Sequence, residues 1–238
     1  SCPTGHGSVG CPPGTLANNF WPAFGNTLFF TLVTVLLETI LGIGMALVMA
    51  KDFHGRGLLR AAVLVPWAIP TAITAKLWAF LFSEQGIVNS IFHAHVAWQT
   101  DPWAARFSII LADVWKTTPF MALLILAGLQ MIPKDLYEAA RMDGANAWQR
   151  FTRITLPLAK NSIIVAVLFR MLDALRMYDL PYIMVGPNPD SPTATLSQLV
   201  VAAIRQDHVN AASALSTLIF LLIFLIALCF VKSLGSKV

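Results

Sequence analysis

Charged residues are scarce in this chain: Asp, Glu, Lys and Arg make up 12% of its 238 residues, whereas 57% are hydrophobic. Soluble domains carry about a quarter charged residues, so this composition excludes an ordinary soluble protein and favours a membrane protein. The net charge is +4, but no cluster of basic residues is interleaved with aromatic ones. That absence excludes nucleic acid as a partner.

Cysteines and catalytic motifs are also scarce. The three cysteines, Cys2, Cys11 and Cys229, show no metal-binding spacing. Cys2 and Cys11 fit either a disulfide on an oxidising side or two free thiols. His93 and His95 lack a third ligand, so we predict no bound metal. HExxH, GxSxG and paired catalytic carboxylates are absent, which disfavours an intramembrane enzyme.

Long apolar runs dominate what remains. A helix that spans lipid needs about 20 apolar residues, because the hydrocarbon layer is about 30 Å thick. Five segments meet this length: Gly25–Ala50, Ala61–Phe82, Phe107–Leu129, Leu156–Leu175 and Ala211–Val231. The fold class predicted from them is all-α, a polytopic transmembrane helical bundle embedded in membrane lipid.

Helix breakers interrupt three of these spans. They are Gly42, Gly44, Pro66, Pro70 and Pro119. Kinked helices persist at membrane depth only where neighbouring helices or a water-filled cavity satisfy the freed backbone groups. The pattern therefore indicates helices around a pathway rather than a simple anchor.

Basic residues orient the bundle in the cell membrane. The loops Lys51–Arg60 and Gln130–Thr155 and the tail from Lys232 hold nine Lys and Arg, whereas the opposite loops hold three. Positive charge collects in the cytoplasm, so we expect that loop set and the C-terminus inside. The expected division is an extracytoplasmic segment 1–24, a transmembrane domain 25–231 and a cytoplasmic tail 232–238. Because this places Ser1 outside, we also expect a further helix upstream.

The stretch YEAARMDGANAWQRFTRITLPL, residues 137–158, is polar yet lies between two apolar spans. Pro133 suits the first turn of a helix, and Asp135 and Glu138 oppose the positive end of the helix dipole. Gly144 should end the helix, because glycine readily adopts left-handed backbone angles. We predict a short helix across the membrane face, which is either a solvated connector or a docking surface.

The same stretch is similar to the EAA signature, EAAxxDGAxxxxxFxxIxLP, of permease subunits of binding-protein-dependent ABC importers. Every fixed position of that pattern is matched between Glu138 and Pro157. Three further segments resemble the maltose-type sugar permeases of that family: Val65–Ile73, Arg176–Ile183 and Ala212–Ser216. The resemblance implies the MetI-like fold of type I ABC importer permeases. It departs at Gly186–Pro189, which reads GPNP where the family has GGGP.

The resemblance also implies partners. Residues 130–157 would form the coupling loop, which docks on a cytoplasmic ATPase through Glu138, Ala139, Ala140, Arg141, Asp143 and Gly144. The implied partners are a homologous second permease, a dimer of ABC ATPases and an extracytoplasmic sugar-binding lipoprotein. ATP and Mg would be held by the ATPases, so neither a cofactor nor a catalytic residue is expected on this chain.

Charged side chains inside the spans need an explanation, because one at the middle of a span costs about 2.5–3.5 kcal/mol. Asp113 and Lys116, and likewise Arg170 and Asp173, lie three positions apart and share a helix face. They are either self-neutralising pairs or the lining of a polar niche for a sugar. Glu38 in the first span is expected to form a hydrogen bond to another helix.

A sugar site combines aromatic rings with polar groups, and Trp78 and Trp115 are candidate platforms. In the maltose-type permeases the sugar touches the helices on either side of the EAA loop. The residues of this chain at comparable depths in the membrane are Lys116, Thr117, Phe120, Arg170, Asp173, Ala174 and Met177. With Asp113, these residues complete the predicted substrate-binding set.

The expected function is ATP-driven import of a neutral di- or oligosaccharide, and similarity to mycobacterial trehalose permeases indicates trehalose. Lys116 and Arg170 each have an acidic neighbour in the sequence, which favours a neutral sugar over glycerol-3-phosphate. Glycerol-3-phosphate or another sugar stays an alternative. A secondary transporter would show inverted repeats, and none is visible.

Overall fold

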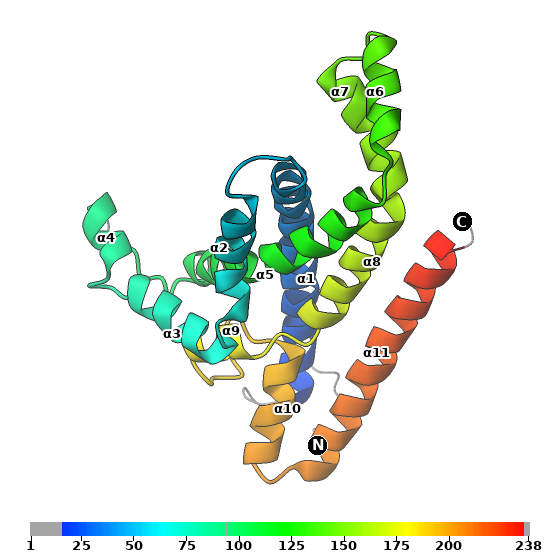
Figure 1. The fold of residues 1–238 in the computed structure, drawn as a ribbon. Helices are drawn as coiled ribbons and strands as arrows, with labels where there is room; N and C mark the ends of the chain where they lie inside the picture. The colour runs from blue at the N-terminus through cyan, green and yellow to red at the C-terminus, as the bar shows by residue number, and fades with distance from the viewer. Residues whose placement is uncertain (1–15, 94, 236–238) are drawn as a thin grey trace. The chain divides into compact units, whose positions relative to one another are not determined.

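The computed structural model describes residues 16–93 and 95–235, and within them every regular element is helical (Figure 1). Cys2, Cys11 and the suggested disulfide between them lie outside the described residues. Helices α1 (Leu16–Met49), α5 (Pro102–Gln130), α8 (Leu156–Ala174) and α11 (Val209–Gly235) carry four of the five predicted spans. Among the described residues, four helical segments are long and apolar enough to cross a membrane, or five if one broken pair is counted as a span. The all-α prediction is confirmed for this part of the chain.

The first span differs from its prediction in two ways. Helix α1 begins at Leu16 rather than at Gly25, and neither Gly42 nor Gly44 interrupts it. Gly42 instead lies against α5, where an added Cβ would be 3.1 Å from the Cβ of Met121. The interpretation of Gly42 as a helix breaker is therefore wrong, because its small size serves close helix packing.

The second predicted span is broken. Helix α2 (Arg56–Ala68) ends before Pro70, and α3 (Thr71–Leu81) starts directly after it. Pro70 has an extended backbone, with φ −53° and ψ 137°. Proline has no N–H and disfavours helical angles at the residue before it, so the chain leaves the helix there. Pro66 and Pro119, by contrast, lie inside continuous helices.

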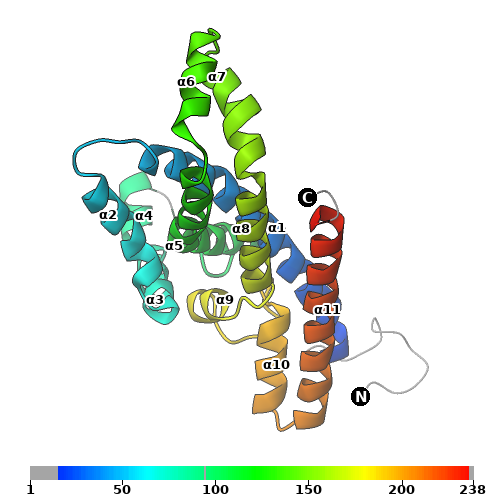
Figure 2. The same ribbon diagram turned by 45° about the vertical axis from the view of Figure 1, so that its right-hand side comes forward.

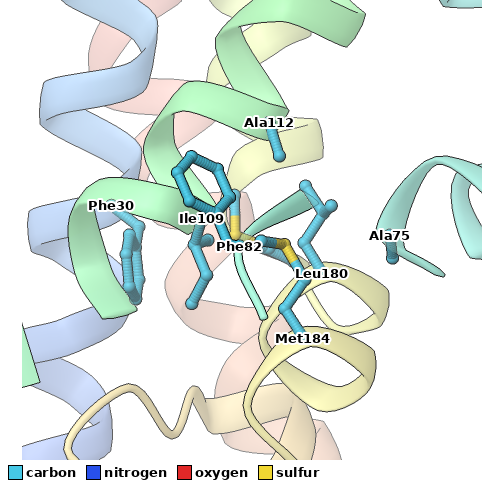
Figure 3. Packing of buried hydrophobic residues seen from close by; sticks show 8 residues of the cluster. Phe30, Ala75, Phe82, Ile109, Ala112, Leu180 and Met184 are labelled. Atoms are coloured by element: carbon cyan, nitrogen blue, oxygen red, sulfur yellow. The ribbon is translucent and has the colours of Figure 1, made fainter. Parts of the chain in front are cut away.

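One compact unit comprises residues 16–34, 69–113 and 171–235. It contains α3, α4 (Ile87–Phe92), α9 (Asp179–Met184), α10 (Leu196–Arg205) and α11. Figure 3 shows Ile109 of α5 and Leu180 and Met184 of α9 gathered around Phe82. Helices α10 and α11 lie side by side and join through a smaller apolar cluster with the start of α1.

The other compact unit comprises Val35–Ala68 and Val114–Arg170. Its core is formed by small and aliphatic side chains of α1, α5 and α8: Ala46, Met49, Met121, Ala122, Ile125, Leu126 and Ala166. From this core extend α6 (Lys134–Met142), α7 (Ala147–Arg150) and a π-helical turn, η2 (Phe151–Thr155), that runs into α8. Both ribbon views show α6 beside α7 as a hairpin (Figure 2). We call residues 131–155 the coupling hairpin, after the coupling loop that the resemblance implies there.

A second close approach joins α5 to α8. A Cβ added at Gly128 would overlap the side chain of Ser162. Only glycine at this position lets the two helices that flank the coupling hairpin pack at this distance.

Gly128→Ala should lower the free energy of unfolding by about 1–3 kcal/mol, because the added methyl group forces α5 and α8 apart. Adding Ser162→Gly to that variant removes the obstructing side chain and should restore most of the loss. Gly44→Ala is the control, since nothing lies within 4 Å of its added Cβ. Thermal unfolding of the purified permease in detergent measures all three, and an equal loss with and without Ser162→Gly would contradict the packing argument.

Candidate functional site

The first helix of the coupling hairpin, α6, starts where the sequence predicts. Pro133 has an extended backbone and precedes Lys134, the first residue of the helix. Asp135 lies in the first turn and Arg141 in the last, so both charges oppose the helix dipole. Residues close in the sequence therefore favour the observed ends of α6.

The end of α6 is a tight left-handed turn. Gly144 has a φ of +76°, which confirms the predicted role of this glycine. The amide of Ala145 donates to the carbonyl of Ala140 at 2.9 Å, and the Gly144 amide donates to the Arg141 carbonyl at 3.0 Å. This pair of hydrogen bonds is the Schellman motif, which satisfies carbonyls that the helix end leaves open.

The second helix begins earlier than predicted. Asn146 and Gln149 form a reciprocal capping box, which starts α7 at Ala147. The helix then continues through η2 into α8, so Pro157 does not mark a new start. Because Pro157 has no N–H, a regular α-helical bond to the carbonyl four residues earlier is impossible, and the π-turn directly before it absorbs this irregularity.

The tip of the hairpin presents apolar side chains to its surroundings. Met142 is 89% exposed and Trp148 is 70% exposed. Of the six predicted coupling residues, Ala140 is half-buried and the others are exposed: Glu138, Ala139, Arg141, Asp143 and Gly144. Large exposed apolar groups ringed by polar ones mark an interaction surface. The structure thus favours a docking surface over a simple solvated connector.

Two contacts fix the base of the hairpin. The Lys134 ammonium lies 2.9 Å from a carboxylate oxygen of Asp52, which also pairs with Arg56. The hydrogen bond and charge of Lys134, with the charge of Arg56, lower the pKa of Asp52 below its ordinary value of 3.8. On the other side, the hydroxyls of Tyr137 and Thr155 are 3.1 Å apart. Sequence analysis missed Asp52, because an acidic residue in a basic loop gives no signal of its partner.

A buried polar network lies in the same unit as the hairpin. Glu38 of α1 is fully buried, and Arg170 of α8 is 2% exposed. The Arg170 Nε donates to one carboxylate oxygen of Glu38 at 2.5 Å, and its Nη2 donates to the other at 3.1 Å. Thr117 of α5 donates its hydroxyl to Glu38 at 2.5 Å. The predicted bond from Glu38 to another helix is confirmed, and it reaches two helices.

Two other predicted substrate residues meet at the end of α2. Lys116 donates to the Trp67 carbonyl at 3.3 Å, and the rings of Phe120 and Trp67 stack 5.6 Å apart. The break at Pro70 leaves carbonyls at the end of α2 without helical donors, so a lysine there acts as a C-terminal cap. Trp115, next to Lys116, is 38% exposed.

The remaining predicted substrate residues lie in the other compact unit, which comprises residues 16–34, 69–113 and 171–235. Trp78 packs against the cluster that contains Met177, and its ring lies 5.6 Å from that of Phe82. Asp113 and Ala174 are buried, whereas Asp173 is exposed. The structure thus joins Lys116 and Phe120 through Trp67, and Thr117 and Arg170 through Glu38. Glu38 and Trp67 are members that the predicted set lacked.

Helices long enough to span lipid, joined by an exposed polar hairpin, define the chain as a multi-pass membrane protein. Residues 38–238 match the family described as "Binding-protein-dependent transport system inner membrane component". The chain therefore belongs to this family of importer permeases, whose members transport substrate and are not themselves enzymes.

Relatives support the same assignment. The chain is 44% identical over 221 residues to the trehalose/maltose transport system permease protein MalF of Thermococcus litoralis, covering 91% of this chain and 75% of that protein. It is 39% identical over 219 residues to the trehalose transport system permease protein SugA of Mycobacterium tuberculosis, covering 91% and 71%.

Solved structures agree on the fold. A bacterial ABC transporter involved in the import of the acidic polysaccharide alginate has a chain 26% identical to this one, with a TM-score of 0.82. That match covers 90% of this chain and 78% of the other. The MetNI methionine ABC transporter, at 19% identity and a TM-score of 0.66, shares the fold. The predicted ABC importer permease fold is confirmed.

The lowered pKa of Asp52 sets a testable pH dependence. Because the folded-state pKa lies below 3.8, the stability that its ion pairs add is complete at neutral pH and is lost only as the pH falls through the lowered value. The stability difference between the wild type and Asp52→Asn should therefore stay constant down to about pH 5 and shrink below 3.8.

Unfolding measured over a pH series gives this difference. Lys134→Met serves as the matched background, because Asp52→Asn should have a smaller effect once the lysine is gone. A difference that grows as the pH falls would overturn the assignment.

The buried pair gives a second prediction. Arg170→Met alone leaves the Glu38 carboxylate without this guanidinium in apolar surroundings, which should cost about 3–5 kcal/mol of stability. The double variant Glu38→Leu/Arg170→Met should recover most of that loss, because packed apolar residues can replace a buried pair.

Thr39→Val is the control. The Thr39 hydroxyl donates to the Val35 carbonyl at 2.6 Å, so the bond that this variant removes lies within α1 and does not join two helices. Thermal unfolding in detergent compares the three variants. An Arg170→Met protein as stable as the double variant would show that the pair is not coupled.

Proposed function

We propose that this permease imports a neutral disaccharide, with trehalose as the first candidate. Two relatives are named for trehalose or for trehalose and maltose, at 39% and 44% identity. The two buried cations described in the coupling-hairpin unit support a neutral substrate. Arg170 is held by the Glu38 carboxylate and Lys116 contacts the Trp67 carbonyl, so both are already engaged by the protein.

An anionic or phosphorylated sugar is the second candidate. A sulfoquinovosyl glycerol permease of Agrobacterium fabrum is 42% identical over 186 residues, and the alginate transporter named above carries an acidic polysaccharide. The substrates for which these two relatives are named differ from trehalose. Among the predicted substrate residues of the coupling-hairpin unit, Trp115 has an accessible side chain and is our candidate for direct sugar contact.

We further propose that the chain forms half of a translocation path with a homologous second permease. A dimer of ABC ATPases, which holds ATP and Mg, would receive the coupling hairpin on the cytoplasmic side, where the C-terminus also lies. An extracytoplasmic sugar-binding protein would deliver the substrate. One solved relative is a complex with an alginate pentasaccharide-bound periplasmic protein, which supports this arrangement.

The exposed tip of the coupling hairpin is the observation that carries this proposal. An apolar residue such as Met142, 89% exposed on a helix with well-defined ends, is suited to insert into a partner. Hydrogen bonds fix the two helix ends at Gly144 and Asn146. A hairpin with such ends would transmit a displacement of the ATPase to α5 and α8 without bending.

ATP hydrolysis by the reconstituted complex identifies the sugar. With the second permease, the ATPases and the binding protein in lipid nanodiscs, trehalose should stimulate hydrolysis more than maltose, and glycerol-3-phosphate should not stimulate it. Stimulation by glycerol-3-phosphate alone would replace the neutral-sugar assignment with the anionic one. No stimulation by any sugar would reject sugar import.

Gly144→Asp tests the coupling role. The variant strains a backbone with a φ of +76° and places a charge at the hairpin tip, so insertion should persist while sugar-stimulated hydrolysis no longer drives uptake. Gly55→Asp is the matched control, because Gly55 has a φ of +90° and equally open surroundings in another loop. Uptake assayed in proteoliposomes against ATP consumed gives the ratio. Normal uptake by Gly144→Asp would exclude the hairpin from coupling.

A further inference from the structure

Three helices of the coupling-hairpin unit meet at one carboxylate. Glu38 supplies it from α1, Thr117 binds it from α5, and Arg170 binds it from α8. All three side chains are at most 8% exposed. The meeting point therefore lies inside the helix packing and not on a surface.

The geometry of this contact restricts motion more than apolar packing does. Arg170 donates from two nitrogens to the two oxygens of Glu38, at 2.5 and 3.1 Å. A bidentate pair of this kind holds both the distance and the mutual orientation of its partners. Apolar side chains resist separation, but they tolerate sliding and rotation because their attraction has no direction.

Close backbone approaches add to the same arrangement. Gly42 brings α1 against Met121 of α5, and Gly128 brings α5 against Ser162 of α8. Helix α8 is thus held both at Ser162, near the hairpin, and at Arg170, eight residues further along. Two separated attachments along one helix prevent it from pivoting about either one.

Helices α5 and α8 are the two that flank the coupling hairpin, so any displacement of the hairpin reaches them first. Along the chain, helix α1 is separated from the hairpin by α2, α3, α4 and α5. Within the coupling-hairpin unit, the polar contact to Glu38 is a directional connection from α1 to both flanking helices. In the other unit, Arg106 of α5 also donates to Asn26 of α1, at 3.1 Å.

We propose that Glu38 is a positioning residue for transport: its pair with Arg170 and its bond from Thr117 lock α1 to α5 and α8, so that the three helices move as one body when the hairpin is displaced. This inference rests on the proposed coupling role of the hairpin. Its consequence is that removing the pair loosens transport from ATP hydrolysis even where the fold survives.

The double variant Glu38→Leu/Arg170→Met tests this, because it removes the directional contact while filling the space. In the reconstituted complex it should assemble and hydrolyse ATP, while sugar transported per ATP falls about fivefold or more, the lower range of ordinary coupling effects. Thr117→Val should lower the ratio less, since the ion pair persists. Thr39→Val is the control and should leave the ratio unchanged. A double variant with the wild-type ratio would show that the pair serves only stability.

A distance measurement tests the lock without disturbing it. Spin labels on Val48 of α1 and Leu158 of α8, both about half exposed, report on the unit in a chain whose three native cysteines are replaced by serine. In the complex, the distance distribution between the labels should be the same without nucleotide and with ATP trapped. In the double variant it should broaden or shift. A shift in the otherwise wild-type complex would overturn the inference, even if the double variant failed to assemble.

The two experiments separate this inference from the proposed function. If no sugar stimulates ATP hydrolysis by the wild-type complex, sugar import is rejected, yet the label distance still reports whether α1 and α8 move together. If sugar stimulates hydrolysis and the label distance changes, the proposed function stands and the lock is rejected.

Discussion

The ion pair between Glu38 and Arg170 is the constraint on which this half of the molecule depends. Inside lipid or packed protein, neither charge is tolerated alone, so each helix can occupy only positions that keep the two groups together. Thr117 adds the third helix to the same carboxylate. Glycines at the helix crossings then allow backbones to approach closely, around a core of small and aliphatic side chains.

The coupling hairpin obtains its shape by a different route. Its first helix is bounded by Pro133 and Gly144, and its second is started by the capping box of Asn146 and Gln149. These signals act over a few residues, and the Lys134–Asp52 pair adds a tertiary contact at the base of the hairpin. A hairpin so defined can project from the helix bundle and keep its form, as a part that contacts another protein must do.

Local features were therefore predictable from the sequence, whereas partners distant in the chain were not. The turn at Gly144 and the positions of most spans follow from backbone preferences and apolar length. The need of Glu38 for a partner was predictable, but its identity was not, because Arg170 lies 132 residues away. Gly42 was misread because helix propensity cannot show that another helix packs against it.

Met142 and Trp148 at the hairpin tip carry a consequence for how such a protein is made. In water, large apolar side chains this exposed favour contacts between copies of the chain that have no partner on the hairpin. A cell that makes more of this subunit than of its partners would therefore accumulate copies that tend to aggregate. Synthesis matched to that of the partners, or proteolysis of unassembled copies, would limit this aggregation.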